Sequence, residues 1–176
     1  MIKIITILSV LICCFIIVSR AYSESNIYTP EYKIISQYNN IEIRQYDKIN
    51  VITTTEMLPY KEATYTGFRT LAGYIFGNNK ENVTIPMTSP VITTLPNEKN
   101  IDINFVVNKD YVLNELPDPI TNKITFDELE LGIVATIKFG FWATPKRIKK
   151  YKRKLETYLN NNSIKYSSKF FVAQYN

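Results

Sequence analysis

Residues 67–92 read GFRTLAGYIFGNNKENVTIPMTSPVI and contain a helix, the end of that helix and the return of the chain into a strand. The apolar side chains recur at the spacing of one helix face, at Phe68, Leu71, Ala72 and Ile75. GNN at 77–79 ends this pattern, because glycine and asparagine tolerate the backbone conformation that follows a helix. VITT at 91–94 then has the β-branched composition of a strand.

Upstream of this stretch, the sequence predicts the start of the helix and three strands. Pro59 suits the first turn of a helix, where its missing N–H costs no hydrogen bond. The segments 32–38 and 41–46 flank Asn39-Asn40, which is the pattern of a β-hairpin. VITTTEM at 51–57 is rich in β-branched residues and predicts a third strand.

Downstream of it, strands are predicted at 101–107 and 132–141, and a closing strand is predicted at 170–175. Between them, Thr144 and Pro145 have the cap and first-turn chemistry of a helix start. The apolar stripe of this second helix consists of Ile148, Tyr151, Leu155, Tyr158 and Leu159. Each half of the chain thus reads strand, strand, helix, strand. The predicted class is α+β with an internal pseudo-repeat, and not a doubly wound parallel sheet.

The first 23 residues have the pattern of a secretory signal peptide. A positive charge at Lys3 precedes the apolar run IITILSVLICCFIIV at 4–18, and small residues stand at Ala21 and Ser23, before the expected cut. The run is shorter than the roughly 20 residues of a membrane-spanning helix, and an uncleaved membrane anchor is the alternative. Removing 23 of the 176 residues leaves 153, which form one domain at 24–176. We therefore expect an exported protein, periplasmic or secreted.

The domain at 24–176 contains no histidine and no cysteine, because Cys13 and Cys14 both lie in the signal. A Ser-His-Asp constellation, a histidine base and the usual zinc sites are therefore excluded. The five glycines nowhere have the spacing of a phosphate-binding loop, and no pair of carboxylates is marked out for catalysis. We expect no catalytic residue, no metal ligand and no enzymatic activity. The net charge falls from +5 to +3 when Lys3 and Arg20 leave with the signal, and this does not indicate a nucleic-acid partner.

Two features of composition each allow two interpretations. The seven basic residues between 146 and 154 are spaced as on the solvated face of an amphipathic helix. The alternative is a surface that meets membrane headgroups, acidic partners or ligand carboxylates. The 13 tyrosines and nine phenylalanines belong mostly to the core and the sheet, although such side chains also hold flat apolar ligands in half-closed sheets.

The segment 67–92 closely resembles the signature of the SOUL haem-binding protein family, which is GF-x-x-LA-x-YIFG-x-N followed by I-x-MT-x-PV. Further segments resemble family motifs in the same order: IEIRQY at 41–46, YVLNELPDP at 111–119 and GIVATIKFGF at 132–141. The resemblance covers nearly the whole domain. It implies two strand-strand-helix-strand repeats that form a distorted antiparallel β-barrel with two flanking helices.

The resemblance also implies reversible binding of haem or a related tetrapyrrole in an apolar cleft beside the first helix. The residues that would border this cleft are Phe68, Leu71, Tyr74, Ile75 and Met87. Arg69 or Lys80 would meet the propionates. For several of these side chains, and above all Phe68, Leu71 and Ile75, plain packing in the core is the competing interpretation.

Two departures from the family pattern modify these expectations. Some members have a histidine assigned as axial iron ligand, whereas this chain offers only Met57, Met87 and tyrosines. Haem is therefore expected to be held mainly by apolar contact, and iron-free porphyrins are expected to share the site. Family chains also usually continue past Gln174-Tyr175-Asn176 into a final strand, so the resemblance implies a missing strand and an open sheet edge.

Two functions from different classes follow. The first is an exported, non-enzymatic binding protein for haem, another tetrapyrrole or a similar flat apolar ligand, held without histidine ligation. The second is an interaction protein that engages a membrane surface or a protein partner through its basic helix or its open sheet edge. The sequence determines neither the physiological ligand nor the oligomeric state.

Overall fold

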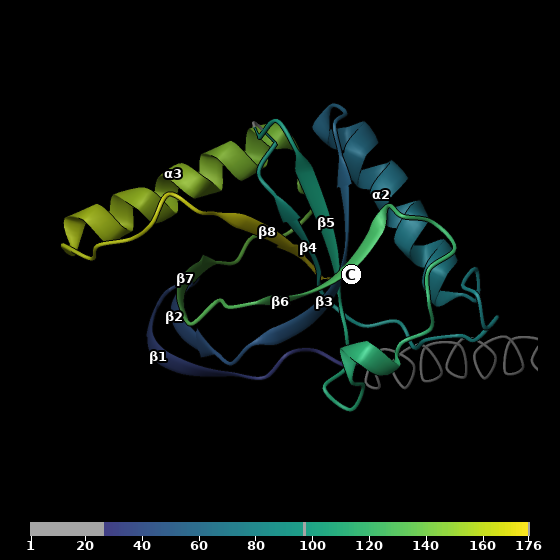
Figure 1. The fold of residues 1–176 in the computed structure, drawn as a ribbon. Coiled ribbons are helices and arrows are strands. Elements are labelled where there is room, and N and C mark those ends of the chain that lie inside the picture. Colours follow the sequence, from purple (N-terminus) through teal and green to yellow (C-terminus); the bar gives the residue numbers. More distant parts are fainter. Residues whose placement is uncertain (1–26, 97, 176) are drawn as a thin grey trace, which may run out of the picture.

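The computed structural model describes residues 27–96 and 98–175, which form eight strands and two α-helices (Figure 1). The strands are β1 (Tyr32–Tyr38), β2 (Ile41–Tyr46), β3 (Ile49–Glu56), β4 (Val91–Thr94), β5 (Ile101–Val106), β6 (Ile124–Leu129), β7 (Ile133–Ile137) and β8 (Phe171–Gln174). The helices are α2 (Tyr60–Ile75), α3 (Pro145–Asn161) and the short 3-10 helix η1 (Leu113–Glu115). The predicted signal peptide at 1–23 lies outside the described residues. Within them, neither helix has the length and apolar character needed to span a membrane.

The strands pair antiparallel in two sheets, of order β1-β2-β7 and β6-β3-β5-β4-β8. β2 pairs with β7, and β6 pairs with β3. The second strand of each half of the chain thus pairs with the third strand of the other half. This arrangement confirms the predicted α+β class with its internal pseudo-repeat. Across the described residues, the two sheets do not close into one continuous barrel.

One detail of the predicted order is wrong, because each half contains three strands before its helix. The prediction missed β6, whose sequence ITFDEL carries Asp127 and Glu128. These acidic residues resemble loop or strand-edge charges in the sequence. In the structure β6 is the edge strand of its sheet, where charged side chains remain in solvent and limit pairing with other chains.

Helix α2 packs one face on the five-stranded sheet. Its buried residues are Tyr60, Ala63, Gly67, Leu71, Tyr74 and Ile75. Gly67 is where helix and sheet come closest, since a Cβ there would lie 2.5 Å from Cδ1 of Ile103 on β5. The helix ends at Ile75, just before the predicted stop at Gly77, whose φ of 102° lies in the region that glycine adopts without strain.

Helix α3 lies across both sheets. Thr144 caps its start by accepting a hydrogen bond from the backbone N–H of Arg147, and Pro145 is its first residue, as predicted. Ile148 packs into the core that α3 shares with α2. Leu155 belongs to a second cluster with strand β2. In Figure 1, α3 runs along the upper left of the molecule and α2 descends on the right.

The five-stranded sheet has an apolar core on each face. Ile52 and Ile103 point to the helices and belong to the largest cluster. Val51 and Val106 point to the opposite face and form a smaller cluster with the half-buried Tyr46 of β2. This smaller cluster holds the two sheets together, because alternate residues of a strand face opposite sides.

Candidate functional site

One flank of α2 remains exposed and aromatic. Tyr65 is 64% exposed, Phe68 38% and Phe76 63%. At 100° per residue, these three side chains and Ala72 lie on one side of the helix, next to its buried face. Exposed aromatic side chains that line up along an element indicate a contact surface more strongly than scattered ones. We call the group of Tyr65, Phe68, Ala72 and Phe76 the aromatic flank.

The chain after α2 folds back along this flank. The backbone N–H of Ile85 donates to the carbonyl of Ile75 at 2.7 Å, and Val91 pairs with Phe105 of β5. Phe105 in turn meets Phe68 edge to face, with 5.2 Å between ring centroids. Met87 lies on the segment between these two contacts and is 38% exposed. Of the predicted site residues, Phe68 therefore contacts β5, and Met87 lies on the segment that leads from α2 to β4.

The buried Asn79 fixes the start of this returning segment. Its side-chain amide donates to the carbonyls of Tyr74, at 3.0 Å, and Val83, at 2.7 Å. Its side-chain oxygen accepts the backbone N–H of Val83 at 3.0 Å. The side chain thus satisfies backbone groups that the end of the helix leaves unpaired, and it holds the segment beside α2.

Three of the predicted site residues lie beneath the flank and not on it. Leu71, Tyr74 and Ile75 are at most 2% exposed and belong to the main core. Their position agrees with the packing interpretation raised for Leu71 and Ile75. A ligand on the exposed flank would have little access to these three buried side chains.

The hydroxyl of Tyr74 already has a hydrogen-bond partner. It donates to the carbonyl of Pro117 at 2.7 Å. Burial, together with the carboxylates of Glu81 and Asp118, raises the pKa of Tyr74 to about 12. A neutral phenol that donates to a backbone carbonyl is a poor source of the tyrosinate that haem iron would require.

The two predicted propionate partners differ in availability. Lys80 forms an ion pair with Asp118, Nζ to Oδ2 at 2.9 Å, and this hydrogen bond raises the pKa of Lys80. Its backbone N–H also donates to the carbonyl of Asp118. Arg69 is exposed, and its guanidinium carbon lies 5.7 Å from the centre of the Tyr65 ring at the edge of the aromatic flank. Arg69 is the better placed of the two to meet a ligand carboxylate.

Metal ligation finds little support in the described residues. They contain no group of three or more His, Cys, Asp or Glu side chains that could hold an ion. Met57 is 75% exposed in the connection between β3 and α2. Of the possible iron ligands named from the sequence, Tyr65 lies on the aromatic flank, and Met87 is partly exposed on the segment between α2 and β4.

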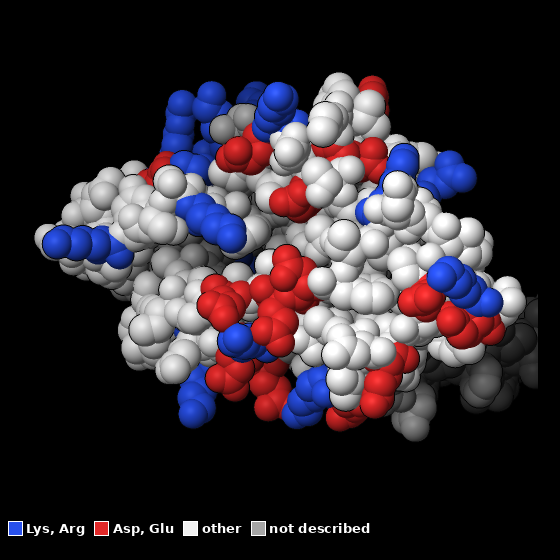
Figure 2. All heavy atoms as spheres, viewed as in Figure 1, with Lys and Arg blue, Asp and Glu red and all other residues white. Residues whose placement is uncertain are grey.

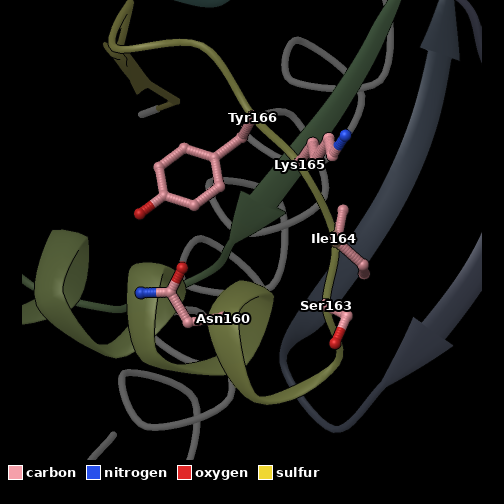
Figure 3. A pocket seen from close by; sticks show the side chains of 5 residues that line it. All are labelled: Asn160, Ser163, Ile164, Lys165 and Tyr166. Carbon is pink, nitrogen blue, oxygen red and sulfur yellow. The ribbon is translucent and has the colours of Figure 1, made fainter.

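A surface hollow of about 580 Å³ lies elsewhere, at the C-terminal end of α3 (Figure 3). Its lining residues are Asn160, Ser163, Ile164, Lys165 and Tyr166. It is open and half polar, and Lys165 points away from Asn160 and Tyr166 in Figure 3. Sites for flat apolar ligands are concave and mostly apolar with a few convergent polar groups, so this hollow is the weaker candidate.

Sequence reasoning missed Tyr65, Phe76 and Phe105 as parts of the candidate site. A signal for the first two was available, because positions 65, 68, 72 and 76 form a second stripe beside the buried one. No local signal could place Phe105, since its contact with Phe68 depends on the packing of β5 against α2.

The comparisons agree with the motifs and with the fold. A family model described as SOUL heme-binding protein matches residues 27–176, which is nearly the entire domain. No curated protein matches the chain. Because the family model covers far more than half of the sequence, this chain belongs to the SOUL heme-binding protein family.

Proposed function

We propose that the protein is an exported, non-enzymatic binding protein for haem or a related tetrapyrrole, which it holds against the aromatic flank of α2. The observation that carries this proposal is the exposed aromatic flank, with Phe68 packed edge to face on Phe105, in a member of a heme-binding family. Export rests on the signal-peptide pattern at 1–23. The test of export is the intact mass of the protein purified from the exported fraction. The expected mass is that of a chain that begins at Glu24.

Apolar contact supplies most of the binding in this proposal. A tetrapyrrole is flat and aromatic, and ring faces such as Phe68 and Tyr65 gain from stacking as well as from the burial of apolar area. Arg69 lies at the edge of the flank, where it can pair with a propionate while the macrocycle covers the rings.

Iron contributes little in this arrangement. The chain has no histidine, Tyr74 is bound to Pro117, and Met57 lies outside the flank, so Tyr65 and Met87 are the ligand candidates near α2. We therefore expect iron-free protoporphyrin to bind with an affinity close to that of haemin.

The test is a titration of the purified chain with haemin and, separately, with protoporphyrin. The expected result is a saturable, stoichiometric change in the Soret band for both ligands. Haemin spectra that match free haemin at every ratio contradict tetrapyrrole binding. If only haemin binds, iron ligation carries the affinity, and loss of binding in Met87→Ala or in Tyr65→Phe then identifies the ligand.

Variants locate the site. Phe68→Ala is expected to weaken both ligands roughly tenfold, because it removes apolar area that the ligand covers. Arg69→Gln should weaken protoporphyrin but not its dimethyl ester, which carries no propionate charge. Tyr166→Ala, in the hollow beside α3, is the matched aromatic control and should leave both affinities unchanged. Loss of binding in the control variant alone would move the site to that hollow.

A further inference from the structure

The loop between β7 and α3 presents two large aromatic side chains to solvent. Phe141 is 93% exposed and Trp142 is 86% exposed. Phe141 also has φ of 62°, a left-handed conformation that is rare and costly for a bulky residue. Backbone strain of this kind persists where the surroundings impose it, and it is concentrated at functional positions. We call Phe141 and Trp142 the aromatic tip.

The base of the tip is firmly held while the tip itself makes little contact with the domain. The guanidinium of Arg147 donates to the carbonyl of Gly140, and its central carbon lies 5.6 Å from the Phe141 ring. Phe139 stacks on Tyr151 of α3, with 4.3 Å between centroids. The loop is therefore braced against α3 at Phe139 and Gly140, directly before the tip.

The helix that follows the tip accounts for the whole positive charge of the protein. Helix α3 contains seven basic residues and one acidic residue, Glu156, which pairs with Lys152. The complete chain has 21 basic and 16 acidic residues, so the rest of it is slightly acidic. At 100° per residue, Lys146, Lys150 and Arg153 share the side opposite the buried Ile148. Figure 2 shows Lys and Arg side chains along the upper and left edge, where α3 lies in Figure 1, and Asp and Glu side chains gathered below.

We propose that the aromatic tip and the basic face of α3 dock on the surface of a bilayer that contains anionic lipids. Trp suits the interface between headgroups and acyl chains, because its ring is buried there while the indole N–H stays hydrated. Phe adds apolar area that the acyl chains cover. Lysine and arginine beside them are attracted by the negative potential of anionic headgroups. The apolar side of α3 stays in the protein core, so the tip, and not the helix, enters the interface. An acidic protein would satisfy the charges but would give no specific role to the two exposed aromatic side chains. This proposal does not depend on tetrapyrrole binding.

The chain carries its own probe, because Trp142 is its only tryptophan. The experiment adds vesicles of phosphatidylcholine, with or without phosphatidylglycerol, to the full-length chain and records tryptophan emission. We expect a blue shift and protection from aqueous acrylamide with the anionic vesicles only. An N-terminal apolar segment that binds vesicles by itself leaves this signal unchanged, since it contains no tryptophan.

Matched variants separate charge from general binding. Lys146→Gln/Lys150→Gln/Arg153→Gln should weaken partition to anionic vesicles roughly 100-fold, because each basic side chain near the surface contributes to binding. Lys33→Gln/Lys61→Gln/Lys123→Gln removes the same charge from exposed positions on other elements and should change partition far less. Phe141→Ser should retain attraction to the vesicles but reduce the blue shift.

Three outcomes overturn the proposal. One is emission that does not change with anionic vesicles, and another is an equal shift with neutral vesicles. The third is an equal shift with soluble polyglutamate, which would assign the surface to an acidic protein partner. Circular dichroism of each variant, unchanged from the parent chain, confirms that the compared proteins are folded.

Discussion

At the scale of single residues, Tyr74 illustrates how a position in the fold changes the chemistry of a side chain. Its hydroxyl donates to the carbonyl of Pro117 at 2.7 Å, and its ring lies 6.0 Å from that of Phe126. The sequence places this tyrosine in the middle of the family signature, where it is a candidate for contact with a ligand. In the structure it stabilises the core instead.

Tyr74→Phe is expected to lower the free energy of unfolding by about 1 kcal/mol, because the carbonyl of Pro117 loses its partner while the ring keeps its packing. Denaturant unfolding measures this change. The same variant should leave the Soret spectrum of bound haemin unchanged. A lost or shifted Soret band would instead make Tyr74 an iron ligand.

The stability should also depend on alkaline pH. The pKa of Tyr74 is raised to about 12 in the fold, mainly by burial, above its ordinary value of about 10. The folded protein therefore holds this proton more tightly, and the associated stability is complete below pH 10 and is lost as the pH rises toward 12. Burial also raises the pKa of Tyr175 to about 12, and Tyr46 beside it adds to the shift. Unfolding between pH 9 and about 12 should thus show a fall that Tyr74→Phe reduces but does not abolish.

At the scale of the elements, the two glycines of α2 differ in how much space their surroundings leave for a side chain. A Cβ on Gly67 would meet Cδ1 of Ile103 at 2.5 Å and Cγ1 of the same residue at 2.8 Å. A Cβ on Gly73 would meet nothing closer than the side-chain amide nitrogen of Asn78, at 3.9 Å. The signature therefore contains one glycine that the contact between helix and sheet requires and one that it does not.

Gly67→Ala is expected to destabilise the fold by about 1–3 kcal/mol, because Ile103 is fully buried and has little room to move. Gly73→Ala, the matched control, should stabilise it by roughly 0.5–1 kcal/mol through helix propensity. Thermal unfolding of both variants measures these effects. Gly67→Ala/Ile103→Val should recover part of the loss, since the valine lacks the Cδ1 atom. A Gly67→Ala variant as stable as the parent chain would show that the helix can move away from the sheet.

At the scale of the whole molecule, the two halves of the sequence form one cooperative unit. β2 and β7 pair across five residue positions, and β3 pairs with both β5 and β6. These pairs join strands of one half to strands of the other. Neither half can satisfy its backbone hydrogen bonds alone.

We therefore expect a chain of residues 24–97 to be unfolded in isolation and to gain structure only when residues 98–176 are added. Far-UV circular dichroism is the measurement. In the intact chain, the unfolding transitions seen by circular dichroism and by Trp142 fluorescence should coincide. A cooperative transition of the isolated first half would mean that the pseudo-repeats are independent units.

The sequence by itself determined the local structure and the excluded chemistry. The hairpin turn at Asn39, the start of α2 after Pro59, its end at Gly77 and the cap of α3 at Thr144 were all predictable. Each depends on the backbone preferences or hydrogen bonds of a few neighbouring residues. The absence of histidine, which removes the usual haem ligand, is likewise a property of composition.

Only the tertiary structure decided which aromatic side chains contact one another and which are buried. The contact of Phe68 with Phe105 and the hydrogen bond of Tyr74 to Pro117 both join segments that lie far apart in the sequence. Such contacts depend on how helices pack on strands and which strands pair, and the spacing of residues along the chain does not encode that arrangement locally. The family signature could therefore be identified from the sequence. Which of its residues are buried in the core and which lie on the exposed flank could not be predicted from it.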